Sequence, residues 1–425
     1  MKTFFASIQW MLFILMGSIV VPIAVATSFG LDNVEIMNFV ARALFVLGIA
    51  GILQVTIGHR LPIQEGPAGV WWGVFTLYST IGIELYGSQK ETLRALSFCF
   101  LVSGVLFIVL ALLGLIDKIA KLFTPTVMGA YLVLMVVQLS GTFLKGMAGV
   151  NGSSPINPLM FLLSIITIIL AYVFAKIKAL GAYSTLCSIL VGWALFAIFG
   201  QAQPIQHTDQ FFKLPEIFVF GMPKFDSSMV LSGIFLTFLL TTNLLASISA
   251  VQIVFKNFNQ PYDEKSMKKA SIASGIIHIL AGTFSAIGSV PISGSAAFIS
   301  QTKNTDKKPF IIGNFLIILI SLSPFFTAVF AALPVAVGYA ALVPTFGIGT
   351  IGIAINQLDT AKDKAARNLV VGASWFVGMG LMFFPSTAYA GLNPLLRTIV
   401  SNGLIIGAIV AVVLDQMLTR RKAAA

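Results

Sequence analysis

Glu65 is an acidic residue that does not fit the surface of a membrane protein. It lies just before an apolar run, in the segment Leu61-Pro62-Ile63-Gln64-Glu65-Gly66-Pro67. An ionisable side chain at membrane depth is costly, so function is its default explanation. The Gly-Pro pair that follows breaks a helix. Because burial in apolar surroundings favours a protonated carboxyl, the position predicts a site that binds a solute and exchanges a proton.

A surface role for Glu65 is the alternative. If the residue lies at the cytoplasmic end of its span, it forms an ion pair with Arg60 in contact with water. Such exposed pairs contribute little to stability.

The composition sets the class of protein that must position Glu65. Hydrophobic residues are 57% of 425 and charged residues only 10%, with a mean hydropathy of +0.96. One soluble core cannot hide that much apolar surface, so we predict an all-α polytopic membrane protein.

A spanning helix needs about 20 mostly apolar residues. Fourteen segments are predicted, of which the third and tenth are short: 7–28, 37–57, 66–82, 93–115, 124–145, 157–176, 180–200, 228–254, 268–287, 293–302, 309–331, 334–356, 366–384 and 399–418.

The distribution of Lys and Arg predicts the orientation. Nineteen of the 26 basic residues fall at the termini and in alternate loops on one side. Basic loops face the cytoplasm, so both termini are expected there, in a cell membrane. The net charge of +11 then reflects topology, and no nucleic-acid partner is expected.

The remaining motifs argue against an enzyme. Cys99 and Cys187 lie in predicted spans without neighbouring histidines, which is typical of packing and not of a metal site. No phosphate-binding loop, metalloprotease motif or nucleophile elbow is present in the sequence. We therefore expect no cofactor, no metal and no ATP-driven pump.

Four other side chains have two interpretations each. His278 is either a proton relay or a hydrogen-bonded packing histidine. Gln138 faces another domain or simply packs. Trp71 and Trp72 either stack on a flat solute or serve as packing and interfacial residues.

Two pairs of similar segments suggest internal symmetry. Pro125 to Gly129 opens the fifth span, and Pro334 to Gly338 opens the twelfth with the same spacing of Pro and Gly. Leu61-Pro62 with Gly66 precedes the third span, and Val290-Pro291 with Gly294 precedes the tenth. Both intervals are seven spans. Because seven is odd, the halves must have opposite orientations, as in the inverted repeats of secondary transporters.

The two short spans indicate where a ligand would bind. Extended backbone around Pro62 and Pro291 cannot face lipid, so it must be buried or line a cavity. The following half-helices would point N–H groups and positive dipole ends toward the centre. These starts are Gly66 to Gly69 and Ser293, Gly294 and Ser295. The alternative is a pair of kinks accommodated by neighbouring helices.

These motifs together resemble the nucleobase-ascorbate transporter family, which includes bacterial uracil and xanthine permeases. The similarity extends over the first span from Ile8-Gln9-Trp10, the Leu61-Pro62 and Gly66 entry, the Pro-Thr-Val-Met-Gly fifth span and Gly288-Ser289-Val290-Pro291. It implies fourteen spans as two inverted repeats of seven, with broken third and tenth spans. The implied core domain comprises 1–115 and 205–332, and the implied gate domain comprises 116–204 and 333–425 with a cytoplasmic tail.

The resemblance also implies a function. Members of this family hold a nucleobase between the third, eighth and tenth spans, and bacterial members couple import of the base to protons. Sodium is the alternative coupling ion. Elevator-like movement of the core and a homodimer are further expectations.

This chain departs from the family pattern at its acidic positions. The glutamate that uracil permeases place in the eighth span is matched by Asn243, and the tenth-span entry has no acid or amide. Glu65 stands where members usually lack an acid, so we predict that it supplies the missing carboxylate. Asn243 and Ser247, four residues apart on one helix face, would offer uncharged donors and acceptors. Hydrogen bonding between helices is the alternative for both.

The predicted function is a secondary active transporter that imports a nucleobase, which is xanthine, uracil or another purine or pyrimidine. The predicted substrate site consists of Gln64, Glu65, Gly66, Gly69, Asn243, Ser247, Ser293, Gly294 and Ser295, with Glu65 as the proton-coupling residue. One alternative is an inverted-repeat transporter of the related anion-carrier fold. Another is a channel-like facilitator.

Overall fold

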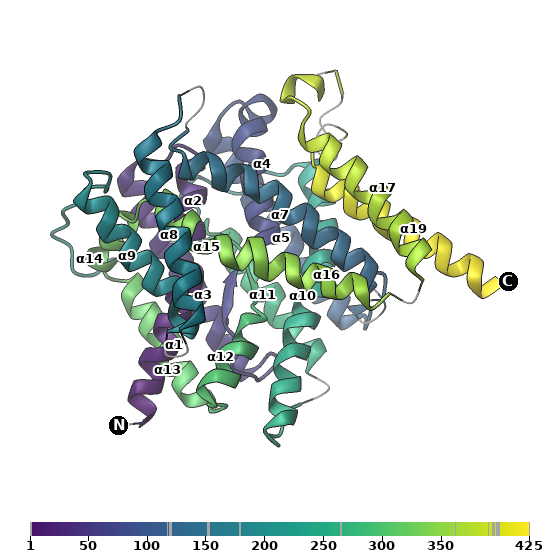
Figure 1. Cartoon of the computed structure of the whole chain (residues 1–425), viewed down its shortest axis with the longest axis horizontal. Coiled ribbons are helices and arrows are strands. Elements are labelled where there is room, and N and C mark those ends of the chain that lie inside the picture. The colour runs from purple at the N-terminus through teal and green to yellow at the C-terminus, as the bar shows by residue number, and fades with distance from the viewer. Residues whose placement is uncertain are drawn as a thin grey trace.

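The fold was derived from a computed structural model. It describes residues 2–424 except 117, 119–120, 151–153, 178–179, 264–265, 362, 390, 393–395 and 397–399. Helices occupy the apolar segments that the sequence singled out (Figure 1).

The first half of the chain is helical apart from one short strand. Its elements are α1 (Lys2–Ser18), α2 (Val20–Ser28), α3 (Asn33–Thr56), β1 (Glu65–Pro67), α4 (Gly69–Tyr86), α5 (Gln89–Leu112), α7 (Pro125–Met147), α8 (Pro158–Lys176), η1 (Gly181–Tyr183) and α9 (Ser184–Ile198). Polar residues define several helix starts. Asp32, for example, accepts hydrogen bonds from the N–H groups of Val34 and Glu35 at the start of α3.

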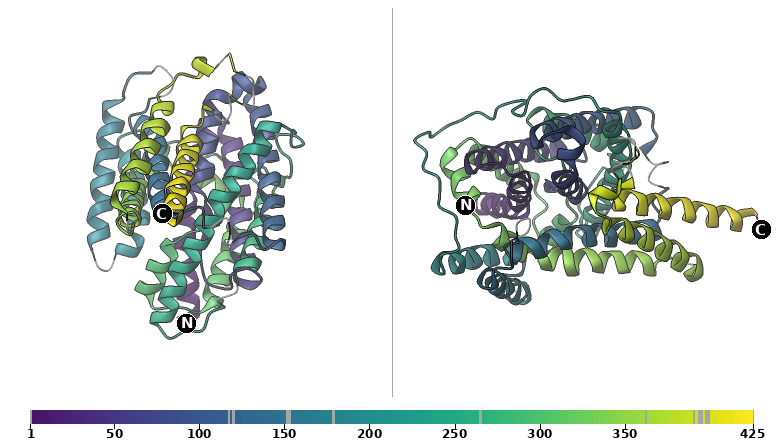
Figure 2. Two further views of the ribbon diagram at one scale, coloured as in Figure 1. Left: turned by 90° about the vertical axis from the view of Figure 1, so that its right-hand side faces the viewer. Right: turned by 90° about the horizontal axis from the view of Figure 1, so that it is seen from above.

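The second half repeats this pattern of a strand followed by a short helix. Its elements are α10 (Ser227–Asn257), α11 (Met267–Thr283), β2 (Ser289–Pro291), α12 (Gly294–Thr302), α13 (Lys307–Ser321), α14 (Pro324–Ala331), α15 (Val335–Val343), the π-helix η2 (Pro344–Thr350), α16 (Ile351–Asp359), α17 (Lys364–Met382), η3 (Ser386–Tyr389) and α19 (Gly403–Ala424). α19 extends beyond the body of the molecule (Figure 2).

Several of these helices can cross a bilayer. Six in the described part of the chain are long and apolar enough, and a seventh is added if the bent pair α13 and α14 forms one span. The number fourteen and the broken spans stay predictions.

One expected span has a different shape. The segment 309–331 was predicted as a single span, but α13 and α14 meet at an angle of 87°. The segment is therefore bent, and that it forms one span stays a prediction. Pro324 begins α14, and proline disfavours helical geometry in the residue before it, so the helix ends ahead of it.

The helices pack in two sets. In one set α5 contacts α10 and α11, while α13 contacts α1 and α3. In the other, α7 contacts α16, α17 and α19, while α15 lies against α8 and α9. The sets meet where α4 touches α7 and α2 touches α15.

Small residues allow the closest helix contact of the first set. A Cβ at Gly104 of α5 would lie 2.6 Å from the carbonyl oxygen of Gly275 in α11, and the reverse distance is also 2.6 Å. The two helices touch through their backbones at this crossing, as small residues permit in membranes.

We predict that Gly104→Ala lowers the melting temperature of the purified protein. The added methyl group overpacks the crossing, which typically costs about 1–3 kcal/mol. Gly141→Ala in α7 is the control, because nothing lies within 4 Å of its Cβ position. That control should be neutral or slightly stabilising, since alanine favours helix. Equal responses of the two variants would contradict the backbone contact.

Candidate functional site

An antiparallel pair of strands forms the centre of the candidate site. Glu65 lies opposite Pro291, Gly66 opposite Val290, and Pro67 opposite Ser289. Hydrogen bonds continue the pairing on both sides, from Ala68 N to Gly288 O (3.1 Å) and from Ile292 N to Gln64 O (2.8 Å). All six strand residues are buried, so the extended backbone satisfies its polar groups inside the protein.

Gly66 is required by this pairing. A Cβ there would lie 2.8 Å from Cγ1 of Ile292, closer than real carbon contacts allow. Glycine is thus needed here for a steric reason, which is the close approach of β1 to the residue after β2, and a role of Gly66 in substrate binding stays a prediction.

Glu65 is buried, with only 1% of its surface exposed. Ser289 Oγ donates a hydrogen bond to Oε2 over 3.1 Å. Oε1 has no hydrogen-bond partner among the described residues. The alternative of an exposed ion pair with Arg60 is therefore wrong. A buried carboxyl with one free oxygen can bind a proton or accept a hydrogen bond from a ligand.

Gln64 and Ser295 fix the strand pair in place. The N–H of Gln64 donates to Ser295 Oγ over 2.9 Å. Its side-chain Nε2 donates to Ile14 O (3.2 Å) and to Ser18 Oγ (3.3 Å) in α1. In this conformation both side chains bind neighbouring protein groups, so they position Glu65.

The starts of α4 and α12 differ in exposure. Gly69 is half-buried, whereas Ser293 and Gly294 are exposed. No side chain caps either start, which leaves N–H groups and the positive end of each helix available to a polar ligand. Because Ser293 and Gly294 are exposed, the start of α12 is the open side of the site.

Asn243 and Ser247 lie on α10, which packs against both β2 and α12. Ser247 is fully buried, and its Oγ has no hydrogen-bond partner in the described part of the chain. Asn243 is half-buried. The fold therefore brings the helix that carries both residues next to the strands that carry Glu65.

His278 is a packing histidine in this structure. Its Nε2 accepts a hydrogen bond from Trp71 Nε1 (3.0 Å), and its Nδ1 lies 2.8 Å from the carbonyl oxygen of Ser274. A carbonyl only accepts, so Nδ1 carries the proton and the ring is neutral. Both nitrogens are thus occupied by contacts among α4 and α11.

Trp72 and Gln138 connect the two sets of helices. The indole of Trp72 packs with the rings of Phe143 and Tyr339, at centroid distances of 5.0 and 6.0 Å. Gln138 Nε2 of α7 donates to Gly73 O of α4 over 2.8 Å. Gln138 therefore faces the other set, as one of its two interpretations expected.

Sequence reasoning missed Ser289 as a partner of Glu65. A strand alternates its side chains, so Ser289 lies on the same face of β2 as Pro291, which is opposite Glu65. The sequence feature that could have indicated this contact is a serine two residues before Pro291. It indicates a partner for Glu65 only when the pairing of the two strands is known.

Comparisons with known proteins show similarity along the whole chain. The model of the Permease family matches residues 1–387. The chain is 41% identical over 429 residues to the "Putative purine permease YwdJ" of Bacillus subtilis, covering 99% of this chain and 97% of that protein. It is 27% identical to the uric acid permease PucJ of the same organism, covering 99% and 93%.

Solved structures give the fold. The transmembrane domain of a cyanobacterial bicarbonate transporter, BicA, aligns with a TM-score of 0.59 at 13% identity, covering 97% of both chains. The murine anion transporter Slc26a9 in its inward-facing state aligns with a TM-score of 0.64 at 12% identity, covering 99% of this chain and 68% of that one. At such low identity this likeness concerns the fold alone.

We predict that Ser295→Ala destabilises the protein. It leaves the buried N–H of Gln64 without its acceptor, which costs about 1–3 kcal/mol. Thermal unfolding in detergent measures this, with the exposed Ser293→Ala as control. A melting temperature that falls equally in both variants, or in neither, would contradict the positioning role of Ser295.

Proposed function

This chain belongs to the Permease family, and we propose that it is a secondary active importer of a nucleobase coupled to protons. Membership makes it a multi-pass membrane transporter and not an enzyme, and it bears out the resemblance to nucleobase-ascorbate transporters. The observation that carries the proposal is the buried carboxyl of Glu65, which has one oxygen without a hydrogen-bond partner among the described residues, between two half-helices.

The proposed substrate is xanthine, uracil or another purine or pyrimidine base. Relatives in Bacillus subtilis include permeases named for uric acid and xanthine. A nucleobase presents adjacent N–H and C=O groups on one planar edge. The free oxygen of Glu65 can accept from its N–H, while the amide of Asn243 and the hydroxyl of Ser247 offer both donors and acceptors. A bare anion would favour a cationic side chain instead, and the segment from Ser289 to Gln301 contains none.

Proton coupling follows from the position of the carboxyl. A carboxylate without a cationic partner is costly at this depth, so Glu65 is stable when it is protonated, and a protonated carboxyl still has an oxygen that accepts a hydrogen bond from the substrate. Loading of the substrate and loading of a proton at one group are therefore linked. Sodium would need several further oxygen ligands around the same group.

Elevator movement of a core against a gate is supported by the two sets of helices. The core would comprise 1–115 with 205–332, and the gate 116–204 with 333–425. Their contact contains the aromatic cluster of Trp72, Phe143 and Tyr339. We extend the proposal to fourteen spans in two inverted repeats, because the antiparallel pairing of β1 and β2 is the arrangement that such a two-fold axis generates. Cytoplasmic termini, a cell-membrane location and a homodimer complete it.

We predict that Glu65→Gln abolishes accumulation driven by a pH gradient. Glutamine keeps the size and a hydrogen-bond acceptor but cannot exchange a proton, so exchange of labelled for unlabelled base across proteoliposomes should persist. Asp209→Asn is the control, since its carboxylate is 97% exposed on a loop. Gradient-driven accumulation that survives in Glu65→Gln would remove its coupling role.

We predict that Asn243→Ala raises the KM for the transported base by about tenfold or more. The loss of one hydrogen bond to a buried ligand group costs about 1–3 kcal/mol. Initial uptake rates over a range of base concentrations measure it, and expression should stay unchanged. The exposed Asn368→Ala serves as control. An unaltered KM would assign Asn243 to helix packing.

A further inference from the structure

A second candidate site lies far from Glu65 in the chain, around the guanidinium of Arg42. A cleft lies between α3, the segment 213–219 and the bend between α13 and α14. Its polar lining includes Asn38, Arg42, Lys213, Glu216, Ser321 and Thr327. The distribution of basic residues predicts that this end of α3 faces away from the cytoplasm.

Arg42 lacks a partner that a buried arginine normally has. Only 3% of its surface is exposed, and its Nε makes no hydrogen bond to any residue that the structure describes. Phe39 and Phe220 flank the guanidinium, each with a ring centroid 5.6 Å away. Cation–π contacts return only part of the cost of burying a charge. An unsatisfied buried cation in a cleft therefore indicates a bound anion.

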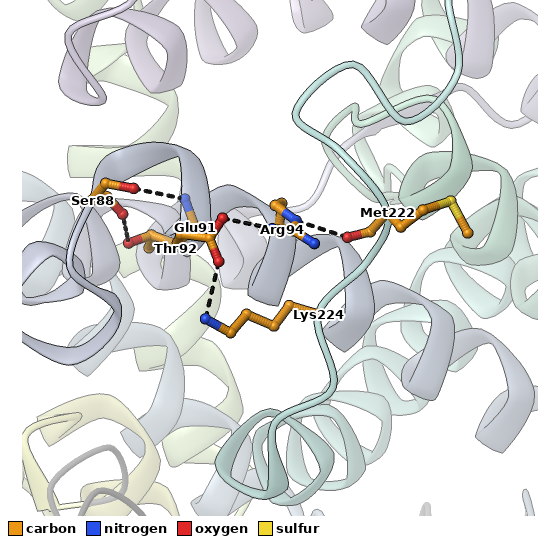
Figure 3. Close-up of polar contacts among 6 residues, drawn as sticks. All are labelled: Ser88, Glu91, Thr92, Arg94, Met222 and Lys224. Carbon is orange, nitrogen blue, oxygen red and sulfur yellow. Dashed lines mark hydrogen bonds and ion pairs between the residues drawn. The ribbon is translucent and has the colours of Figure 1, made fainter.

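The segment that covers Arg42 is held firmly against the helices. Lys213 N donates to Leu322 O (2.9 Å), and Phe218 N donates to Thr283 O (2.8 Å). Further along, Arg94 Nε donates to Met222 O (2.9 Å), and Lys224 Nζ lies 2.9 Å from Glu91 Oε2 (Figure 3). Figure 2 shows the long connection from α9 to α10 running along the outside of the molecule. The cleft is thus built by several attachments and not by a loose loop.

Four charged groups lie around the cleft, two cations and two carboxylates, and only Arg42 among them has no ion pair or hydrogen bond among the described residues. Lys213 pairs with Glu216 at 3.0 Å and donates to Asn38 Oδ1 at 3.3 Å. Glu35, the other carboxylate near Arg42, is engaged at the start of α3, where it accepts from Asp32 N. Neither carboxylate forms a salt bridge with Arg42 within the described ranges. An anionic group bound in the cleft would give the guanidinium of Arg42 the hydrogen-bonded partner that Glu216 and Glu35 do not provide.

The surroundings of the cleft suit a lipid. α14 turns by 87° from α13, so that it lies along the membrane surface if α13 crosses the bilayer. Its Phe325 and Phe326 are 58% and 46% exposed, and Phe211 and Phe212 of the covering segment are 91% and 62% exposed. Exposed phenylalanines such as these can insert at the boundary between lipid headgroups and acyl chains.

We propose that the cleft at Arg42 and Lys213 binds a phosphate group, and that an anionic phospholipid of the outer leaflet provides it. The guanidinium binds phosphate oxygens through charge-assisted hydrogen bonds, and the acyl chains pack beside α14. This site is independent of the nucleobase proposal.

Thermal unfolding of the full-length protein in mild detergent tests the site. Phosphatidylglycerol should raise the melting temperature of the wild type, and phosphatidylcholine of the same chain length should raise it less. Arg42→Gln should bind phosphatidylglycerol about tenfold more weakly or worse, as expected for a lost charge-assisted hydrogen bond. Without lipid, Arg42→Gln should be about as stable as the wild type, because it removes a buried charge that makes no hydrogen bond among the described residues.

Two further variants keep the test decisive. Lys213→Gln should also weaken the response and should fold, since its side chain is 36% exposed. Lys145→Gln, an exposed lysine at the end of α7, should respond like the wild type. Stabilisation by inorganic phosphate that Arg42→Gln loses would support the phosphate site but assign it to a soluble ligand. Two results would overturn the proposal. In one, phosphatidylglycerol and phosphatidylcholine raise the melting temperature of the wild type equally and inorganic phosphate does not raise it. In the other, phosphatidylglycerol stabilises both Arg42→Gln and Lys213→Gln as much as the wild type.

Discussion

The hydrogen bonds between β1 and β2 are the constraint on which the candidate transport site depends. Two three-residue strands lie among helices, and extended backbone inside a membrane protein must find every partner within the protein. The strands satisfy each other, and Ser295 supplies the acceptor that Gln64 N would otherwise lack. This pairing places the starts of α4 and α12 directly after two adjacent strands, and it places Glu65 beside Ser289.

The same constraint explains which helices surround the site. α10 packs against β2 and α12, while α1 receives the amide of Gln64. Helices of the other set reach α4 through Trp72 and Gln138. A movement between the two sets would therefore change the exposure of the half-helix starts without separating the strands. The Arg42 cleft lies within the first set and would travel with it.

The sequence predicted the interruptions because Pro62, Pro67 and Pro291 cannot donate backbone hydrogen bonds. It also predicted that Glu65 would be a buried site residue. It could not predict the antiparallel register, because strands separated by over two hundred residues leave no local signal. The hydrogen bond from Gln64 N to Ser295 Oγ could not be predicted for the same reason, because it forms only when the strands pair. The sequence therefore predicted only a substrate-binding role for these two residues. The 87° bend before Pro324 was missed because the run from 309 to 331 is mostly apolar and has only Ser321 and Ser323 as polar side chains at the bend.

The proposed function depends most directly on the inward movement of a proton together with the transported base. The most direct measurement is the luminal pH of proteoliposomes that contain a trapped pH-sensitive dye and start without a pH gradient. Uracil, xanthine and other bases are added outside in turn. The account predicts that at least one base acidifies the lumen, saturably and only in vesicles with protein. Saturable uptake of labelled base with no change in luminal pH would contradict proton coupling, and no uptake of any base by folded protein would contradict nucleobase transport.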